Sequence, residues 1–339
     1  MSESGSIVAD TATRIFADLA DPQTVNRAKD ASWKEPLWRA LTNSGLTLAW
    51  IPEEKGGAGA SAADAFEVAR IAGRFAAPVP IAETLLAGWL LSRAGISSPD
   101  GAMTIAPARP GDRVTFGSDG TLSGRARGVP FAGEAQHLAV YAMGDTGATV
   151  ALVDAKACRI TESGGLGDGV SVVTFDCAEP AEAGPAPAGL DQAALMLMGC
   201  ALRSVQTAGA LEAILAMSVQ YANERVAFER AIGRFQAVQH NLARLAGEVA
   251  AALAASGSAA DAIGSAEVFD DAIFLEAASA KIRSAEAATE GAAIAHQVFG
   301  AIGFTQEHVL HRFTLRLLGW RDDFGNESYW AAELGKRVA

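Results

Sequence analysis

The sequence predicts a mainly α-helical α+β protein in which a β domain separates two helical domains. Up to about residue 102 the apolar residues recur at helical spacing. From 103 to 187 short β-prone pieces alternate with turn residues, and from 188 to 339 helical spacing returns. We therefore expect an N-terminal helical domain over 1–102, a middle antiparallel β domain over 103–187 and a C-terminal helical domain over 188–339. With 339 residues, the chain is long enough for two or three packed units.

The N-terminal helices are predicted from short apolar faces and clear stops. Leu37, Trp38 and Leu41 form one such face, and Ser44-Gly45 supplies the stop. The glycine cluster at 56–59 cannot continue a helix. Because no predicted strand precedes this cluster and no Lys-Ser or Lys-Thr pair follows it, we interpret it as a turn between helices rather than a phosphate-binding loop.

The middle region is predicted as strands because it is rich in β-prone residues and turn formers. Gly, Asp, Ser and Pro separate four such pieces, at 113–116, 137–142, 149–153 and 170–175. This pattern is typical of a small antiparallel β domain. The stretch 179–187 is rich in Ala, Pro and Gly and is predicted to be a linker.

The C-terminal region is predicted to form a helical bundle. One apolar stripe advances in steps of four, three, four and four residues through Val238, Leu242, Leu245, Val249 and Leu253. The next predicted helix, from about 270 to 295, carries alanine on several faces, which allows neighbouring helices to approach closely.

Composition and charge exclude several classes of partner. The net charge of −12 argues against nucleic acid and against an anionic membrane surface, because both recruit cationic patches. Cys158, Cys177 and Cys200 lie far apart, which favours neither a disulfide framework nor a zinc site. The first residues lack the pattern of a secretory signal, and the apolar run Ala193–Leu202 is shorter than the ~20 residues of a spanning helix. We expect a cytoplasmic protein without a membrane partner.

Histidines do not indicate a metal centre. His308 and His311 lie three residues apart on a predicted helix, without a third ligand at a suitable spacing. We interpret them as structural residues and expect no metal.

The most informative segment runs from Arg225 to His240. Arg225 and Phe228 lie three residues apart and would share one face of a helix, whereas Gly233 interrupts the pattern and Gln236 follows the bend. A planar guanidinium can donate two parallel hydrogen bonds to a diphosphate, and an aromatic ring can pack on a flat heterocycle. The competing interpretation is that Arg225 is a solvated or ion-paired residue at a helix end.

This segment resembles the acyl-CoA dehydrogenase signature, in which Arg-x-x-Phe-Gly and Ile-Gly-x-x-Gln precede a long helix. Residues 296–304, His-Gln-Val-Phe-Gly-Ala-Ile-Gly-Phe, resemble the family's Gln-x-x-Gly-Gly-x-Gly-[Phe/Tyr] element. Trp50–Gly59, with 77–86 behind it, resembles the family's helical N-terminal domain. The resemblance covers nearly the whole chain. It implies the acyl-CoA dehydrogenase fold, an N-terminal helical domain, a middle antiparallel β-barrel domain and a C-terminal four-helix bundle.

The resemblance implies FAD bound in an extended form between subunits. The family's cofactor contacts match Arg225, Phe228, Ile232 and Gln236 in the first segment, and Gln297, Gly300 and Ala301 in the second. Glycine at 300 would let the backbone approach a phosphate. The alternative for Gly300 and Gly303 is a helix end followed by a turn. Glu229 replaces the glycine of the Phe-Gly pair, and Ala301 replaces the second glycine of the Gly-Gly pair.

The middle domain departs further from the family. The segment at 103–110 does not clearly carry the family's Thr-Glu-Pro element, and 124–131 lacks its tryptophan. Phe131 either takes the place of that tryptophan or belongs to the core.

The resemblance also implies a carboxylate base that removes the α-proton of an acyl-CoA thioester. In the matching loop the glutamate position holds Gly325, while Glu327 follows two residues later and Asp323 precedes it by two. The region at 199–203, where other members carry the base, has no acidic residue. Glu327 is therefore the candidate base. Its alternative role is a helix-start carboxylate favoured by the helix dipole.

Three functional hypotheses follow from the resemblance. The first is an FAD-dependent acyl-CoA dehydrogenase with its own base, and the second is a non-catalytic subunit that completes the flavin site of a partner. The third is an interaction protein that has lost flavin. For the enzyme, the resemblance implies an acyl-CoA substrate and electron-transfer flavoprotein as the acceptor. It also implies either a homodimer or homotetramer, or a heterotetramer with a second acyl-CoA dehydrogenase subunit, as in steroid side-chain breakdown.

Overall fold

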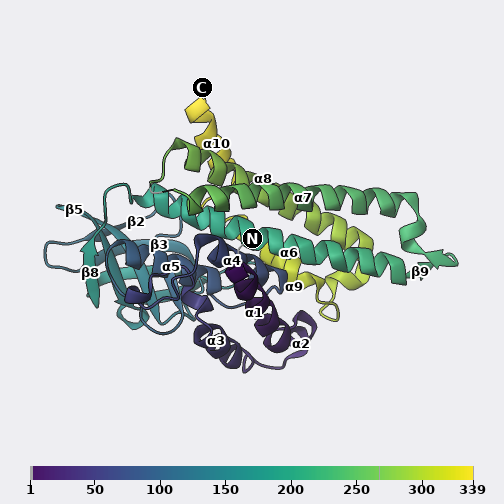
Figure 1. Cartoon of the computed structure of the whole chain (residues 1–339), viewed down its shortest axis with the longest axis horizontal. Helices are drawn as coiled ribbons and strands as arrows, with labels where there is room; N and C mark the ends of the chain where they lie inside the picture. Colours follow the sequence, from purple (N-terminus) through teal and green to yellow (C-terminus); the bar gives the residue numbers. More distant parts are fainter. Residues whose placement is uncertain (1–2, 267, 339) are drawn as a thin grey trace.

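The computed structural model describes residues 3–266 and 268–338, and its elements follow the predicted order (Figure 1). The N-terminal part contains five α-helices, α1 Glu3–Leu19, α2 Pro22–Arg27, α3 Lys34–Asn43, α4 Ala62–Arg74 and α5 Ile81–Arg93. The start of α4 is set by a capping box. The Ser61 hydroxyl accepts from the Asp64 amide at 3.1 Å, and the Asp64 carboxylate accepts from the Ser61 amide at 3.2 Å.

The predicted β domain is confirmed, and its strand pairing is mixed. The strands are β1 Met103–Ala106, β2 Arg113–Phe116, β3 Leu122–Pro130, β4 His137–Gly144, β5 Gly147–Asp154, β6 Arg159–Gly164, β7 Val170–Ala178 and β8 Glu182–Pro185. Neighbouring strands follow the order β6-β7-β3-β2-β4-β5-β8, and β1 pairs with β4. Most pairs are antiparallel, as predicted, but β1 and β2 each run parallel to β4.

The parallel pairs were not predictable from local patterns, because alternation shows that a strand exists and not which strand it pairs with. Among the described residues the hydrogen-bonded path begins at β6 and ends at β8, so hydrogen bonds do not close the sheet into a complete barrel. The stretch predicted as a linker, 179–187, instead contains the edge strand β8.

The C-terminal part is the predicted helical bundle. It comprises α6 Gln192–Glu224, α7 Gln236–Gly264, α8 Asp271–Phe299 and the shorter α9 Leu310–Trp320, with α10 Glu327–Val338 following. Figure 1 shows α6, α7 and α8 side by side, while α10 projects from the opposite side to α1–α3. The predicted domain boundaries at 102/103 and 187/188 fall at the start of β1 and between β8 and α6, and they stay a prediction.

Two glycines bring the N-terminal helices onto the bundle. A Cβ at Gly73 of α4 would collide with the Gln206 carbonyl of α6, and one at Gly209 would collide with the Arg70 carbonyl of α4. The two backbones therefore touch, which only glycine permits at both positions. This crossing also holds α5, which follows α4, next to the middle of α6.

Helix α6 is long and apolar enough to span a membrane by length and composition alone. It has 33 residues and contains a window of mean hydropathy 1.3. The expectation that its apolar run is too short to span a membrane is therefore wrong. That window lies wholly inside the protein, which is the arrangement of a core helix.

Candidate functional site

The segment after α6 forms a β-hairpin. Residues Val226–Ala227 (β9) pair with Arg230–Ala231 (β10), and Phe228 and Glu229 occupy the turn with φ of 50° and 66°. The expectation that Arg225 and Phe228 share a helix face is therefore wrong. The helix ends at Glu224, and Arg225 caps it with an extended backbone. A two-residue hairpin turn of this kind needs positive φ at both central residues, and Asn-Gly is the usual pair there. The pair Phe-Glu therefore gives no sequence signal for the turn.

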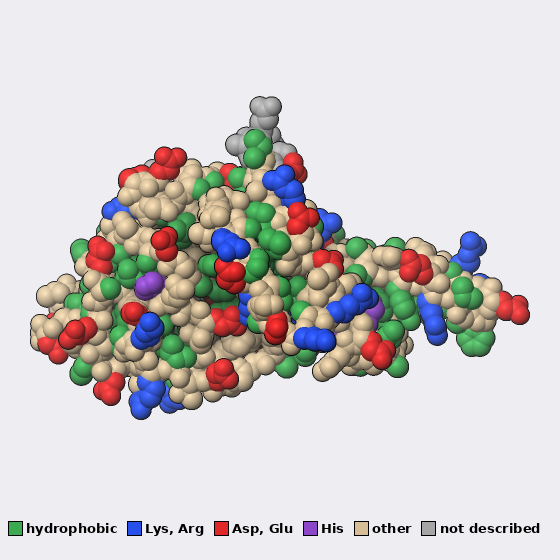
Figure 2. All heavy atoms as spheres, turned by 90° about the horizontal axis from the view of Figure 1, so that it is seen from below, with side chains coloured by type: hydrophobic (Ala, Val, Ile, Leu, Met, Phe, Trp, Pro, Cys, Tyr) green, Lys and Arg blue, Asp and Glu red, His purple; other side chains and the backbone are tan. Residues whose placement is uncertain are grey.

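The hairpin projects from the end of the bundle and exposes an aromatic ring. Phe228 is 89% exposed and Val226 is 60% exposed. Figure 2 shows this narrow end extending from the body of the protein, with hydrophobic side chains between basic and acidic ones. Phe235 supports the hairpin from behind, because its ring meets Phe228 edge-on at 6.2 Å and carries the Arg230 guanidinium at 4.1 Å.

Arg225 is held by its backbone and not by its side chain. Its amide donates to Tyr221 and its carbonyl accepts from Ile232, both at 2.8 Å. Within the described part of the chain, its exposed guanidinium has no hydrogen-bond or ion-pair partner. Gln236, the first residue of α7, is exposed as well. The hairpin therefore presents a cation, an aromatic ring and an amide to the outside.

The second predicted element lies where α8 ends. Gly300 ends the helix with φ 63° and ψ −144°, and no atom lies within 4 Å of the position a Cβ would take. Glycine is thus required by the backbone angle and leaves open space beside it. A hollow of about 570 Å³ lies against this element, with Gln297, Gly300 and Ala301 on its wall.

Both predicted elements lie at the same end of the bundle. Tyr221, in the last turn of α6, stacks on Phe299 at the end of α8 with ring centroids 4.4 Å apart. The hollow beside Gly300 nevertheless has no wall from the hairpin residues Arg225, Phe228, Ile232 and Gln236. Within one chain the two elements are neighbours that face different spaces.

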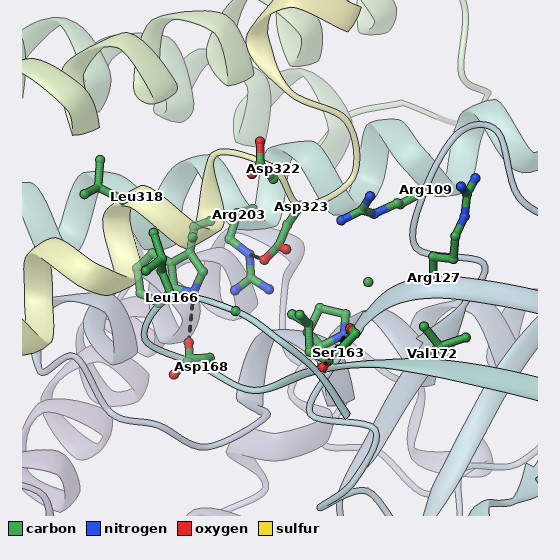
Figure 3. A pocket seen from close by; sticks show the side chains of 16 residues that line it. Arg109, Arg127, Ser163, Leu166, Asp168, Val172, Arg203, Leu318, Asp322 and Asp323 are labelled. Atoms are coloured by element: carbon green, nitrogen blue, oxygen red, sulfur yellow. Dashed lines mark hydrogen bonds and ion pairs between the residues drawn. The ribbon is translucent and has the colours of Figure 1, made fainter. Parts of the chain in front are cut away.

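A second cavity, of about 530 Å³, lies between the sheet and the bundle (Figure 3). Strands β3, β6 and β7 form one wall, and α6, the end of α9 and the loop after it form the other. Leu318 of α9 contacts this cavity and also the hollow beside Gly300, so α9 separates the two spaces.

The inner wall of the cavity is an ionic network around Arg203. The Arg203 side chain is 1% exposed. It donates to Glu83 of α5 and to Gln206, and its Nε lies 3.0 Å from Asp323 Oδ2. The guanidinium also lies 5.4 Å from the ring centre of Trp320 and 5.8 Å from that of Phe324. Figure 3 shows Asp323 pointing toward Arg203.

A second ion pair adjoins the first. Asp168 Oδ1 lies 2.9 Å from Arg316 Nε, and Asp168 Oδ2 accepts from the Trp320 indole at 2.9 Å. Trp320 links the two pairs, because its indole donates to Asp168 and its ring faces Arg203. The Trp320 carbonyl also accepts from buried Lys281 at 2.6 Å.

Burial and pairing shift the pKa values of this network. Burial raises the pKa of Glu83 and of Asp323, although Arg203 opposes the shift in both. Burial lowers the pKa of Lys281. For Arg203 burial acts to lower the pKa, but the charges of Glu83 and Asp323 exceed it and the pKa is raised.

The loop predicted to hold the base is anchored in the interior. Phe324 has φ 58° and is 3% exposed, and its carbonyl accepts from Trp330 Nε1 at 3.0 Å. Its ring lies over Gly199 of α6, where a Cβ would come within 2.5 Å of the ring. Buried Cys200 points its thiol at the same carbonyl, with Sγ 3.3 Å away.

Glu327, the predicted base, starts α10 and is paired with Arg321. It is not part of the cavity wall. Partial burial acts to raise its pKa, but its own backbone amide and Arg321 outweigh burial, so the pKa is lowered. This is the helix-start arrangement that the sequence left as the alternative. The assignment as base stays a prediction.

The described carboxylates on the cavity wall are engaged or turned away. Asp168 and Asp323 are ion-paired. Asp322 is exposed, and Figure 3 shows its side chain pointing to the side opposite Arg203. Within residues 3–266 and 268–338, the cavity thus presents no unpaired carboxylate aimed inward.

Two of the histidines, His296 and His308, contact nearby polar groups of the helical region. The His308 ring accepts from the Leu310 amide at 3.1 Å, and His296 lies 2.9 Å from the Thr314 hydroxyl. No group of three or more potential metal ligands exists among the described residues.

Sequence reasoning missed the ionic network, although it left a signal. Glu83 stands in the apolar run of α5, and Arg203 stands in the apolar first half of α6. A single charge within an apolar helix requires a buried partner. The sequence did not show that these two charges, 120 residues apart, are partners.

Comparison with known proteins shows the family. The family model for the acyl-CoA dehydrogenase N-terminal domain matches residues 2–97, and that for the acyl-CoA dehydrogenase C-terminal domain matches residues 189–327. The chain belongs to the acyl-CoA dehydrogenase family.

Individual relatives are similar over most of their length. Acyl-CoA dehydrogenase IpdE2 of Mycobacterium tuberculosis is 28% identical over 320 residues, 94% of this chain and 92% of that protein. Acyl-CoA dehydrogenase FadE27 of the same organism is 29% identical over 331 residues, 89% of this chain and 88% of that protein.

Solved structures agree with the fold. A variant of the Tcur3481-Tcur3483 steroid ACAD superposes with a TM-score of 0.85 at 28% identity, over 99% of this chain and 98% of that chain. The ChsE4-ChsE5 complex of Mycobacterium tuberculosis gives a TM-score of 0.88 over 100% of this chain and 98% of that chain. At 24% identity the latter shows the fold alone.

Members of this family depend on FAD, and the bundle end has the chemistry for part of it. A guanidinium without a partner in the described part of the chain, an exposed ring and an open glycine backbone suit a diphosphate and a heterocycle. Glu229 does not contradict this, because it is exposed in the hairpin turn and is free to point away.

Proposed function

We propose that this chain is one subunit of an FAD-dependent acyl-CoA dehydrogenase and that a second, related subunit completes its flavin site. The enzyme removes hydrogen from the α- and β-carbons of an acyl-CoA thioester, and bound FAD supplies the hydride acceptor. Electron-transfer flavoprotein is the expected acceptor after that, and we place the protein in the cytoplasm.

The observation that carries this proposal is the exposed bundle end. Arg225 and Phe228 are exposed, and the Arg225 guanidinium has no partner among the described residues, while Gln297 and Gly300 face a different hollow. Two elements that face apart cannot enclose one extended ligand within a single chain. A facing subunit would bring the complementary element to each, so the site requires an oligomer.

A heteromer is favoured because the described residues supply no unpaired carboxylate aimed into the cavity, while Glu327 is bound to Arg321. Support also comes from similar solved structures, the Tcur3481-Tcur3483 steroid ACAD and the ChsE4-ChsE5 complex. We infer that the partner provides the base. The second candidate, a self-sufficient dehydrogenase, would require Glu327 to leave Arg321.

The first test is flavin content. We expect the chain purified alone to hold little flavin and to gain it on mixing with the partner subunit. Arg225→Gln should lower the flavin retained by the assembled protein about tenfold, because an Arg–phosphate contact is charge-assisted. Arg159→Gln, which removes an exposed charge from β6, is the matched control. Equal flavin content in both variants would exclude Arg225 from the flavin site.

The second test addresses the base. In the assembled enzyme, Glu327→Gln should leave the rate of flavin reduction by acyl-CoA within about twofold, because the base lies on the partner. A loss of about a thousandfold or more, with flavin content unchanged, would instead make Glu327 the base and this chain a complete dehydrogenase.

A further inference from the structure

The segment that joins β6 to β7 is rich in glycine. Residues 163–169 read Ser-Gly-Gly-Leu-Gly-Asp-Gly, and Gly164, Gly165 and Gly167 adopt φ of 82°, 138° and 79°. Glycine has the largest backbone freedom of any residue, so this segment can change direction at several points. Every residue from 163 to 169 is exposed except Asp168. The segment therefore buries a single side chain.

This segment forms one wall of the cavity around Arg203. Figure 3 shows Leu166 on the same side of the cavity as Leu318 of α9. Arg109 and Arg127 line the cavity on the far side and are exposed. The cavity thus opens to solvent at the two arginines, and the segment 163–169 closes the opposite side.

The segment rests on α9 by close approaches of backbone. A Cβ at Gly319 of α9 would come within 2.3 Å of the Leu166 carbonyl oxygen, and one at Gly167 within 2.7 Å of the Arg316 backbone nitrogen. Because glycine has no side chain to bury, these approaches contribute little apolar contact. Segments with few buried contacts open at a low free energy cost compared with the whole fold.

One side chain fastens the segment to α9. Asp168 Oδ1 lies 2.9 Å from Arg316 Nε, and Asp168 Oδ2 accepts from the Trp320 indole at 2.9 Å. Within residues 3–266 and 268–338, these are the only polar contacts between the segment and α9. The β7 end is held to the β domain instead, because the Gly169 carbonyl accepts from the Phe131 amide at 3.0 Å.

We propose that residues 163–169 are a lid on this cavity, with glycines at both ends as hinges and Asp168 as the latch. In the closed state the lid lies against α9. Opening exchanges the contacts of Asp168 with Arg316 and Trp320 for contacts with water, and it widens the cavity on the α9 side. The open lid admits molecules that are too large for the opening at Arg109 and Arg127. This inference concerns access to the cavity, so it requires neither flavin nor turnover.

The test measures how fast a thiol inside the cavity reacts with a small and a bulky reagent. Val172 of β7 is half-buried and lies on the cavity wall, so Val172→Cys places the thiol there. The exposed Cys177 is removed by Cys177→Ser in every protein. The reagents are N-ethylmaleimide and fluorescein-5-maleimide, which share one reactive group, and mass spectrometry of the full chain follows both reactions.

Two lid variants should shift the bulky reagent in opposite directions. Asp168→Asn should speed its reaction at least about tenfold, because the latch loses its charge, and should change the small reagent by less than about twofold. Gly169→Ala should slow the bulky reagent about threefold, because alanine restricts a hinge. A Cβ at 169 would meet no atom within 4 Å, and φ there lies outside the left-handed region. Asp176→Asn, which removes an exposed charge of β7 outside the lid, is the control and should change neither rate.

Thermal melting shows whether each variant is folded. Equal rates of the bulky reagent in all variants would show that the segment is a fixed wall, and equal acceleration of both reagents by Asp168→Asn would show general loosening. Either result would overturn the proposal. If Asp168→Asn does not fold, Gly169→Ala decides alone, and an unchanged rate of the bulky reagent rejects the lid. No outcome depends on flavin, so the proposed function keeps its own tests.

Discussion

Arg203 inside helix α6 and Arg225, which caps the end of that helix, represent two regions of the molecule that use a charge differently. Arg203 lies inside the protein with Glu83, Gln206 and Asp323 around it. Arg225 caps the same helix at the exposed end, where its side chain has no partner in the described part of the chain. A charge surrounded by partners contributes to the fold, whereas a charge fixed by its backbone and left unpaired is available to a ligand.

The largest expected effect is a difference in the free energy of unfolding between variants of these two arginines. Arg203→Met should lower the free energy of unfolding by about 3–5 kcal/mol, because it leaves Glu83 buried without its cation. Arg225→Met should change it by less than about 0.5 kcal/mol, as surface substitutions usually do. Urea unfolding followed by circular dichroism measures both. A loss below about 1 kcal/mol for Arg203→Met would show that Glu83 is neutral in the native protein.

A double variant tests whether the loss comes from the stranded charge. Glu83→Gln combined with Arg203→Met should recover part of the stability lost by Arg203→Met alone, since no unpaired ion remains. Strictly additive losses in the same unfolding experiment would argue against coupling between the two side chains.

A smaller effect compares two glycines, one from each region. Gly199→Ala should cost about 1–3 kcal/mol, because its methyl group would meet the Phe324 ring in a packed interior. Gly300→Ala has open space around its Cβ and should cost only the backbone strain of positive φ, about 1–2 kcal/mol.

The two glycine variants should also differ in function. Gly300→Ala should lower flavin retention, since it brings a methyl group to the hollow beside Gln297, whereas Gly199→Ala should alter the 321–326 loop. Unfolding curves and flavin content, measured on both variants, check the contrast. Equal flavin loss in the two would remove the distinction between the regions.

The same division explains what the sequence could reveal. The helical, β and helical segments were predictable because each rests on local periodicity, as in the stripe from Val238 to Leu253 that covers α7. The parallel pairing of β1 and β2 with β4 was not predictable, because it depends on contacts between distant segments.

The candidate site divides in the same way. The sequence could propose Arg225, Gln236, Gln297 and Gly300 as candidates because they lie within short segments that carry a family pattern, and their roles stay predictions. The conformation of Phe228-Glu229 was missed, because a hairpin turn with two positive φ angles is unusual for those residue types. The Arg203 network was missed because its members come from α5, α6 and the loop after α9, which no local pattern brings together.

The smallest expected effect compares two carboxylates four residues apart, Asp323 and Glu327. The pKa of Asp323 is raised by burial, whereas that of Glu327 is lowered because its own amide and Arg321 outweigh burial. Asp323 therefore contributes stability at low pH that is lost as the pH rises through its raised pKa. Glu327 contributes stability above its ordinary pKa of 4.5 that is lost as the pH falls through its lowered pKa.

The two slopes can be separated by removing Glu327 alone. Glu327→Gln should reduce the loss of unfolding free energy between about pH 5 and about pH 3, by roughly 0.5 kcal/mol because the pair with Arg321 is partly exposed. Asp323 remains unchanged in that variant, so the loss of stability as the pH rises above the ordinary pKa of 3.8 should persist. A variant that keeps the full acid-side loss would show that Arg321 does not hold Glu327 in solution, and the carboxylate would then be free to act as a base.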